Sequence, residues 1–333
     1  MPTEVTRLLD NIRREAGDEQ AETLDKLLPD RRQARADMAR ALWFKATFIR
    51  GKGDNDGAIE LFSRTIQIYD ELLTEYPGEP KYRRNQALTW KNLGSVYFLQ
   101  TNFAAALESY KKALVADAEL AASAENDVSA QMDLSFSHIS IARAYSKLND
   151  TTKAFEEFSK AVKIQERLHN QDPKNMFVLN RLIRSYASLA ESLRDLNKLS
   201  EAESLYQKSF QLLSGSPVES LSSIERAQVA LMYFSRANFF LRRSESMAAG
   251  RKQTDQKSAM ADLEKAHSIF SELKARQTLD PAFEKDLAAV SDKLLQVRSR
   301  SSLWAQNWPA LHSYRSKFGI QNLKPSRSTG VKP

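Results

Sequence analysis

The 333-residue sequence contains no cysteine, and glycine and proline occur only ten times each. The absence of cysteine excludes disulfide frameworks, thiolate zinc sites, iron–sulfur ligation and cysteine nucleophiles. Sandwiches, barrels and doubly wound sheets of this length need many tight turns, so the shortage of turn-forming residues favours long helices joined by short connections. The sequence therefore predicts an all-α fold.

Long hydrophobic runs are also missing. No apolar stretch approaches the roughly 18 residues that a transmembrane helix needs. The charged N-terminal segment lacks the apolar centre of a signal peptide. We therefore expect a soluble chain without an integral membrane span, located in the cytoplasm.

An excess of one charge occurs only near the C-terminal end. The formal net charge is +7, from 49 Lys and Arg against 42 Asp and Glu. Eight of the basic residues and none of the acidic ones lie in residues 293–333, which leaves 41 basic against 42 acidic residues in 1–292. Nucleic-acid binding is therefore not expected of the main body, which has no basic excess to attract phosphates.

A pattern of small and large residues repeats along the chain. Residues 90–113 match the tetratricopeptide (TPR) pattern through Trp90, Leu93, Gly94, Tyr97, Ala106, Tyr110 and Ala113. At steps of 48 residues, the position of Gly94 is filled by Ala46, Ala142 and Ala190, with Ala237 in a fifth unit. The position of Ala106 is filled by Ala58, Ala154, Ala202 and Ala259. The sequence therefore predicts five related units.

Helix packing explains this pattern. Two antiparallel helices approach closely where their facing residues are small, and a bulky residue one turn away fills the remaining gap. We expect the large residues of the pattern to form the core: Trp90, Tyr97, Tyr110, Phe158 and Tyr206. The period exceeds the usual 34 residues, so each helix should be about two turns longer than usual. The predicted fold is a right-handed, TPR-like α-solenoid of about five extended helical hairpins.

The pattern also predicts the domain organisation. We expect an N-terminal helical cap over residues 1–30 and a capping helix over 279–298. Between them, the repeats should span about 31–77, 78–125, 126–173, 174–217 and 218–278. The last repeat contains a polar segment, 242–258, that is interpreted as a loop, either contacting a ligand or simply solvated.

The C-terminal segment 299–333 is basic and aromatic, and disorder is expected from about residue 322. Trp304 and Trp308 are expected to cover the end of the last repeat, because the ends of a solenoid need capping. The alternative is that this segment contacts nucleic acid or an anionic membrane.

The 48-residue phase, the segment Leu8–Asp18 and the segments Phe270–Leu273 and Leu279–Pro281 resemble the C-terminal TPR region of certain bacterial serine/threonine protein kinases. The similarity covers about residues 5–298. It implies a sensory or docking region that a membrane span separates from a kinase domain, and an extracytoplasmic location if this chain is such a region. The sequence has no glycine-rich loop, His-Arg-Asp or Asp-Phe-Gly motif, so no phosphotransfer residue can be assigned.

No residue cluster points to catalysis, a metal or a cofactor. The four histidines, His138, His169, His267 and His312, form no ligand pair at helical spacing. The segment Gly51–Gly57 fits neither a phosphate loop nor a calcium loop, and it is interpreted as the turn of the first hairpin. We therefore expect a non-catalytic protein.

In TPR proteins the first helix of each hairpin lines the concave groove. The candidate ligand contacts at such positions are Arg40, Trp43, Thr47, Lys91, Ser95, Ile139, Arg143, Arg184, Glu191, Phe234 and Asn238. The same spacing also selects Arg50, Leu88, Phe98, Phe136, Ser146, Ala187, Arg194, Leu231 and Leu241. Together these positions hold six basic residues and one acidic residue.

Such a groove suits an acidic peptide or partner protein, because guanidinium groups bind carboxylates bidentately and aromatic rings anchor apolar side chains. The carboxylate clamp of some TPR proteins is not reproduced, since Trp43 stands where a clamp lysine is expected. Three readings remain open besides a binding groove. The arginines could pair with neighbouring carboxylates, the chain could be the detached regulatory region of a kinase system, or it could associate with nucleic acid through its tail. The sequence does not determine the oligomeric state.

Overall fold

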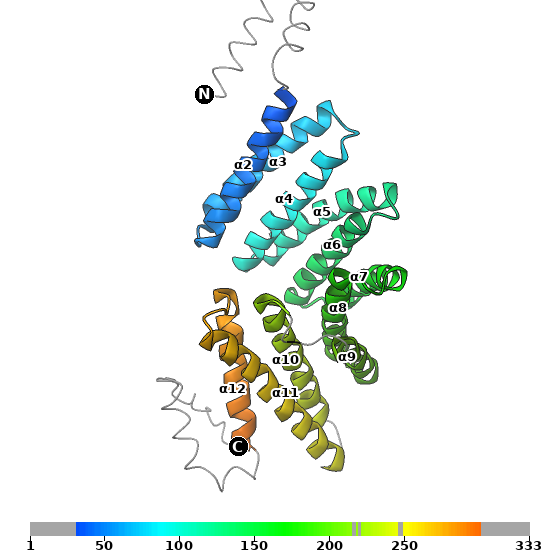
Figure 1. Ribbon diagram of the computed structural model, residues 1–333, viewed down its shortest axis with the longest axis vertical. Coiled ribbons are helices and arrows are strands. Elements are labelled where there is room, and N and C mark those ends of the chain that lie inside the picture. Colours follow the sequence, from blue (N-terminus) through cyan, green and yellow to red (C-terminus); the bar gives the residue numbers. More distant parts are fainter. Residues whose placement is uncertain (1–30, 215–217, 219–220, 246–248, 301–333) are drawn as a thin grey trace, which may run out of the picture. The chain divides into compact units, whose positions relative to one another are not determined.

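The computed structural model describes residues 31–214, 218, 221–245 and 249–300 (Figure 1). The expected cap at 1–30 and the tail beyond residue 300 lie outside the described residues. Within the described part the chain is helical and contains no strand, which confirms the all-α prediction. The described residues fall into two compact units, unit 1 up to Leu212 and unit 2 from Leu213.

Unit 1 consists of four helical hairpins. They are formed by α2 (Arg31–Gly51) with α3 (Asn55–Glu75), α4 (Pro80–Leu99) with α5 (Phe103–Ser123), α6 (Val128–Lys147) with α7 (Thr151–Gln171), and α8 (Met176–Asp195) with α9 (Leu199–Ser214). The second helices begin at residues 55, 103, 151 and 199, so consecutive starts are 48 residues apart. The 48-residue repeat and the extended helices are confirmed.

The turn within each hairpin repeats with the same period. Residues 53, 101, 149 and 197 all have positive φ, and they are Gly53 (φ 90°), Thr101, Asn149 and Asn197 (φ 61° each). The left-handed region costs other residues about 1–2 kcal/mol, and glycine and asparagine tolerate it best. The next residue caps the second helix: Asp54 accepts a hydrogen bond from the backbone N–H of Gly57, and Asn102 and Asp150 do the same in the next two hairpins. The segment Gly51–Gly57 is therefore a hairpin turn, as its sequence indicates.

Small residues let the two helices of a hairpin approach closely. A Cβ atom added to Gly94 of α4 would lie only 2.6 Å from Cε1 of Tyr110 on α5. In the neighbouring hairpins, Ala46 packs with Phe62 and Ala142 with Phe158 in buried clusters. The predicted core residues Tyr110, Phe158 and Tyr206 are buried, and Trp90 and Tyr97 pack half-buried against the same clusters.

Replacing Gly94 with alanine should destabilise unit 1 by about 1–3 kcal/mol, because overpacking against Tyr110 outweighs the gain in helix propensity of about 1 kcal/mol. Chemical denaturation of the purified chain measures this difference. Gly250→Ala is the matched control: Gly250 lies in a helix with no atom near the added methyl group, so that variant should be neutral or more stable. Equal stability of the Gly94→Ala variant and the natural chain would contradict the close approach.

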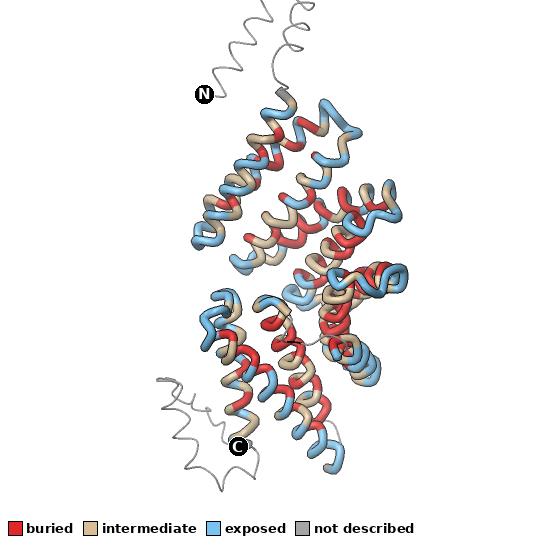
Figure 2. The backbone as a smooth tube through the Cα atoms, in the orientation of Figure 1, coloured by how far each residue is buried: buried red, intermediate tan, exposed pale blue. Residues whose placement is uncertain are grey.

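Consecutive hairpins of unit 1 pack against one another through α3 with α4, α5 with α6 and α7 with α8. The first helices also contact each other in sequence, from α2 to α4, α6 and α8, whereas α3, α5 and α7 have at most marginal contact among themselves. The buried residues lie along the sides where helices meet (Figure 2). The first helices of unit 1 therefore share one continuous face.

Unit 2 contains the hairpin of α10 (Ser223–Glu245) and α11 (Ala249–Ala275), followed by a short 3₁₀ turn, Pro281–Phe283, and α12 (Glu284–Arg300). The carboxylate of Asp280 accepts a hydrogen bond from the N–H of Ala282 and so begins this turn. The helix α12 packs against α11, with Leu294 in a buried cluster with Leu263.

The segment 242–258 is not the loop that its sequence predicts. Helix α10 continues to Glu245 and α11 begins at Ala249, so all but residues 246–248 of this polar segment is helical. The reason is an ion pair between the two helices. The guanidinium of Arg243 donates to both carboxylate oxygens of Asp255, at 2.8 Å each, and the side chains are only 6% and 2% exposed.

Candidate functional site

Arginine side chains stack on phenylalanine rings between neighbouring first helices of unit 1. The guanidinium carbon of Arg143 on α6 lies 5.3 Å from the ring centre of Phe98 on α4. On the next helix, Arg181 of α8 lies 4.9 Å from the ring centre of Phe136 on α6 and 5.4 Å from that of Phe177. Each such contact contributes about 0.5–1 kcal/mol at an exposed site. We call the surface formed by these five residues the Arg–Phe face.

Each of the two stacks leaves one of its groups exposed. Arg143 is exposed, and it has no carboxylate within ion-pair distance among the described residues. Phe177 is half exposed, and its ring meets that of Phe136 edge-on at 6.3 Å. The Arg–Phe face therefore presents a held guanidinium beside accessible apolar rings.

Lys91 is engaged inside unit 1, in contrast to its predicted role as a ligand contact. Its ammonium lies 3.0 Å from Oδ2 of Asp117 and 3.6 Å from Oδ1 of Asp133. The Asp117 side chain is completely buried and also accepts a hydrogen bond of 2.6 Å from the hydroxyl of Ser137. Burial raises the pKa of Asp117, while the charge of Lys91 acts in the opposite direction. Lys91 therefore holds α4, α5 and α6 together.

Three further candidates on α2 also have internal partners. Arg40 is exposed and pairs with Asp37 at 2.8 Å, and the Thr47 hydroxyl donates to the carbonyl of Trp43. Trp43 packs against a buried cluster, with an indole N–H that is buried without a hydrogen-bond partner. Arg50, selected by the same spacing, donates to the amide oxygen of Asn92 at 3.2 Å.

The remaining candidates are half-buried. Ser95 lies on α4, and Ile139 packs against the cluster that contains Phe158. On α8, Arg184 donates to the backbone carbonyl of Asn180 at 3.3 Å, and Glu191 interacts electrostatically with Arg194. Phe234 and Asn238 belong to α10 in unit 2, where Phe234 packs against a core cluster. Among the predicted positions, Arg143 and Phe98 come from different helices and are in direct contact.

The repeat pattern does not select Arg181 or Phe177. Both lie in the first two turns of α8, before the positions chosen from the pattern of a 34-residue repeat. The extended helices lengthen the shared face at this end. The 48-residue period could have identified them, because it predicts additional helical turns at this end of each first helix.

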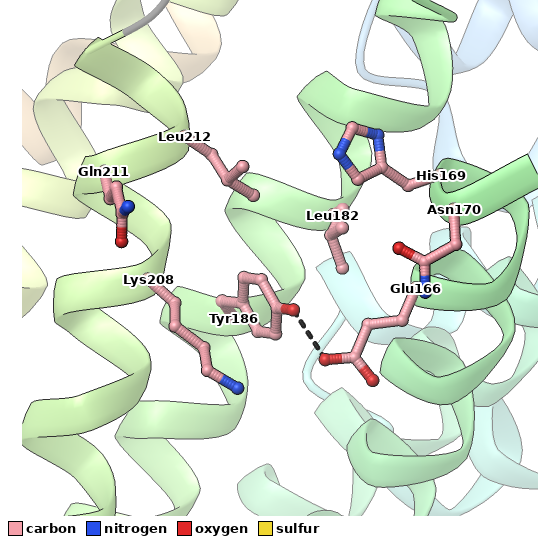
Figure 3. A pocket seen from close by; sticks show the side chains of 8 residues that line it. All are labelled: Glu166, His169, Asn170, Leu182, Tyr186, Lys208, Gln211 and Leu212. Carbon is pink, nitrogen blue, oxygen red and sulfur yellow. Dashed lines mark hydrogen bonds between the residues drawn. The ribbon is translucent and has the colours of Figure 1, made fainter. Parts of the chain in front are cut away.

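A second feature is a cavity of about 410 Å³ between α7, α8 and α9. It is lined by Glu166, His169, Asn170, Leu182, Tyr186, Lys208, Gln211 and Leu212 (Figure 3). The Tyr186 hydroxyl donates to Glu166 at 2.5 Å, and burial together with this hydrogen bond raises the pKa of Tyr186. The Lys208 ammonium lies 5.8 Å from the Tyr186 ring centre, and Nδ1 of His169 is buried without a hydrogen-bond partner.

The five residues of the Arg–Phe face are arginines and phenylalanines, so this face holds neither a carboxylate nor a hydroxyl of its own. Across the described residues, no three or more His, Asp or Glu side chains lie close enough together to hold a metal ion. In the same part of the chain, every helix is too short or too polar to cross a membrane. The Arg–Phe face offers an exposed guanidinium, that of Arg143, and a half-exposed ring, that of Phe177.

Two family models described as tetratricopeptide repeat match the chain, one over residues 137–167 and one over residues 182–213. No curated protein sequence matches it. The first match runs from the middle of α6 into α7, and the second from the middle third of α8 through most of α9. The chain thus contains tetratricopeptide repeats, as its pattern of small and large residues predicts.

Several crystal structures are similar to this chain over most of its length. The apo form of RapI is 12% identical, with a TM-score of 0.51 over 85% of this chain and 68% of RapI. BtubC from P. vanneervenii is 15% identical, with a TM-score of 0.46 over 84% of this chain and 98% of its own length. Aspartyl phosphate phosphatase F from Bacillus subtilis is 12% identical, with a TM-score of 0.48 over 84% of this chain and 63% of its own. The chain is an all-α, TPR-like solenoid protein, and identities this low concern the fold alone.

Proposed function

We propose that this chain is a non-catalytic protein-interaction scaffold whose Arg–Phe face binds an acidic segment of a partner protein. The observation that carries the proposal is Arg143, an exposed guanidinium held against the Phe98 ring with no carboxylate partner among the described residues. Stacking on the ring leaves the N–H edge of a guanidinium available for a bidentate contact with a carboxylate.

The size of the face favours a helical partner segment. First helices of about 20 residues are about 30 Å long, and four of them lie in contact in series. A partner helix laid along this surface could place an acidic side chain on Arg143 and an apolar one beside Phe177. In this mode of recognition, the bound helix contacts its groove through anchor side chains spaced about one helical turn apart.

The kinase resemblance bears on the identity of the partner. A regulatory region would bind a signalling protein, so recovery of a serine/threonine kinase or its substrate would support that relation. Recovery of other proteins would leave the scaffold proposal intact and remove the kinase relation. The basic tail lies outside the described residues and supplies no observation in favour of nucleic-acid binding.

The test is an affinity pull-down with the full chain, read by quantitative mass spectrometry. Arg143→Glu should weaken capture of the specific partner by about tenfold or more, because the variant places a like charge opposite an acidic segment. Capture by the natural chain should also weaken as salt is raised. Lys163→Glu is the matched control, since Lys163 is an exposed lysine on α7, away from the first helices. Equal capture by the natural chain and Arg143→Glu, or equal losses in both variants, would refute this face as the binding site.

A further inference from the structure

The cavity between α7, α8 and α9 has one charge of each sign on its walls (Figure 3). All of its lining residues belong to unit 1. Glu166 comes from α7 and Lys208 from α9, and the ring of Tyr186 on α8 lies between them. Neither charged group forms an ion pair with any residue that the structure describes, so the two are not paired with each other either. The cavity therefore holds two opposite charges apart.

Lys208 lacks the partner that the equivalent lysine has in the preceding repeat. That lysine, Lys160, lies 48 positions earlier, and its ammonium is 2.7 Å from the carboxylate of Glu157, one turn before it. The residue 48 positions after Glu157 is Leu205, which carries no charge. The ammonium of Lys208 is therefore available to an anionic group in the cavity.

Glu166 also lacks a partner that an equivalent carboxylate has. Two periods earlier, Asp70 accepts a hydrogen bond of 2.6 Å from the side-chain amide of Gln86 on α4. The residue at the position of Gln86 is Leu182, which is buried and apolar. One oxygen of Glu166 accepts the hydroxyl of Tyr186, and the other has no hydrogen-bond partner within the described residues. This second oxygen is available to a cationic group.

The cavity lies where the repeat has a smaller ring than in an earlier unit. Two periods before Tyr186 stands Trp90, and the ammonium of Lys112 lies 4.2 Å from the centre of its ring. The corresponding distance from Lys208 to the centre of the Tyr186 ring is 5.8 Å. The cavity of about 410 Å³ falls within the range of small-molecule sites, roughly 300–1,000 Å³.

The apolar residues of the cavity lie apart from the two charges. Leu182 of α8 and Leu212 of α9 line the cavity, and both lie above the Tyr186 ring in Figure 3. The charged ends of Glu166 and Lys208 lie below this ring in the same view. Apolar walls with a few polar groups that fix the orientation of a ligand are typical of small-molecule sites. The cavity thus has a charged end and an apolar end.

We infer that this cavity binds a free α-amino acid with an apolar side chain. The ammonium group of the amino acid donates to the available oxygen of Glu166, and its carboxylate accepts from the ammonium of Lys208. The side chain of the amino acid lies against Leu182 and Leu212. The cavity shares no residue with the Arg–Phe face, so this inference and the proposed function stand or fall separately.

A zwitterion suits the charged end better than an ion of either sign. A small anion would pair with Lys208 but bring its charge towards Glu166, and a small cation would do the reverse. Charges removed from water need compensating partners, and a free amino acid supplies one for each of the two groups. A peptide carries the same two charges at opposite ends of its chain, whereas an amino acid carries both next to its side chain.

Isothermal titration calorimetry of the full chain with L-leucine tests the inference, together with two analogues that each lack one charge. 4-Methylpentanoate is leucine without the ammonium group, and L-leucinamide is leucine without the carboxylate. We expect L-leucine to bind at one site and each analogue to bind at least about tenfold more weakly, because each loses one charge-assisted hydrogen bond. Equal affinity for L-leucine and either analogue would overturn the inference. So would the absence of binding at millimolar concentration by all of L-leucine, L-isoleucine, L-valine, L-methionine and L-phenylalanine.

Two substitutions locate the binding in the cavity. Lys208→Met and Glu166→Gln each remove a charge at nearly constant side-chain volume, and the amide oxygen in Glu166→Gln can still accept the Tyr186 hydroxyl. Each should weaken binding of the amino acid at least about tenfold. Lys160→Met and Asp70→Asn are matched controls, because they remove the same charges at equivalent repeat positions and should leave the affinity unchanged.

Thermal unfolding followed by circular dichroism checks that each variant is folded, and the two analogues test the same contacts without any substitution. Unchanged affinity in both cavity variants, or an equal loss of affinity in the controls, would place the binding elsewhere and overturn the inference.

Discussion

Replacing Lys91 with methionine is expected to destabilise unit 1 by about 3–5 kcal/mol at neutral pH. The Asp117 carboxylate is completely buried, and its second oxygen, Oδ1, has no hydrogen-bond partner. Without Lys91, the ammonium that compensates this charge is gone and only the Ser137 hydroxyl remains on Oδ2. An uncompensated carboxylate in a protein interior is among the most destabilising features a substitution can create.

The cost should depend on pH. Because burial raises the pKa of Asp117 above its ordinary value of 3.8, the folded chain binds this proton at pH values where the unfolded chain has lost it. Stability therefore falls as pH rises from the unfolded pKa to the folded pKa. Removing Lys91 raises the folded pKa further and extends that fall to higher pH. The difference between the variant and the natural chain should thus be large at about pH 7 and smaller at about pH 4.5.

Denaturant titrations at the two pH values, followed by tryptophan fluorescence, measure this difference. Lys111→Met is the control, because Lys111 forms an exposed pair with Glu108 that should contribute less than about 1 kcal/mol. The double variant Lys91→Met, Asp117→Leu should recover most of the loss, since no buried charge then remains. A neutral effect of Lys91→Met at both pH values would refute the buried pair. Lys91 is also unsuitable for charge reversal in a binding test, because the variant would lose stability before it lost a ligand.

The second large effect is expected at Asp255. Its replacement with alanine should destabilise the α10–α11 hairpin by about 3–5 kcal/mol, because it leaves the guanidinium of Arg243 buried without its carboxylate. The rings of Phe239 and Phe240, at 4.9 Å and 5.4 Å from the guanidinium carbon, hold this group in an apolar setting. Their attraction to the cation is small compared with the lost bidentate pair.

Hydrogen exchange resolved by peptide suits this prediction, because the loss should appear in α10 and α11 while α4 and α5 of unit 1 stay protected. Arg276→Met provides the control, since Arg276 is 65% exposed and pairs with Glu272 one turn away. Combining Arg243→Met with Asp255→Leu should restore protection. An equal loss of protection in both units would contradict a stabilising effect of the ion pair that is confined to the α10–α11 hairpin.

The sequence predicts the hairpins well because side-chain volume encodes how closely two helices approach. Gly94 and Ala142 mark the close contacts, and Tyr110 and Phe158 mark the gaps that they leave. The composition of the polar segment 242–258 predicts a loop, although most of it is helical, for a related reason. Composition does not distinguish a solvated arginine from Arg243, whose carboxylate partner lies twelve residues away on another helix.

The candidate site was predictable only in part. Arg143 and Phe98 follow from the repeat pattern, but the partner of Lys91 does not, because Asp117 lies 26 residues away on a different helix. The spacing of residues within one helix does not predict such a pair. Arg181 and Phe177 lie in turns that the shorter repeat lacks, so positions copied from the shorter repeat stop before they reach the end of the face.

The way unit 1 packs also governs how fast it can form. Each helix packs mainly on the helices next to it in sequence, so every contact closes only a short loop of chain. Short loops lose little entropy on closure, and chains with local contacts fold fast. Because neighbouring hairpins use equivalent interfaces, folding can begin in any one of them and spread in both directions. We therefore expect the hairpins at the ends of the array to open first when the protein unfolds, and the central ones to open last.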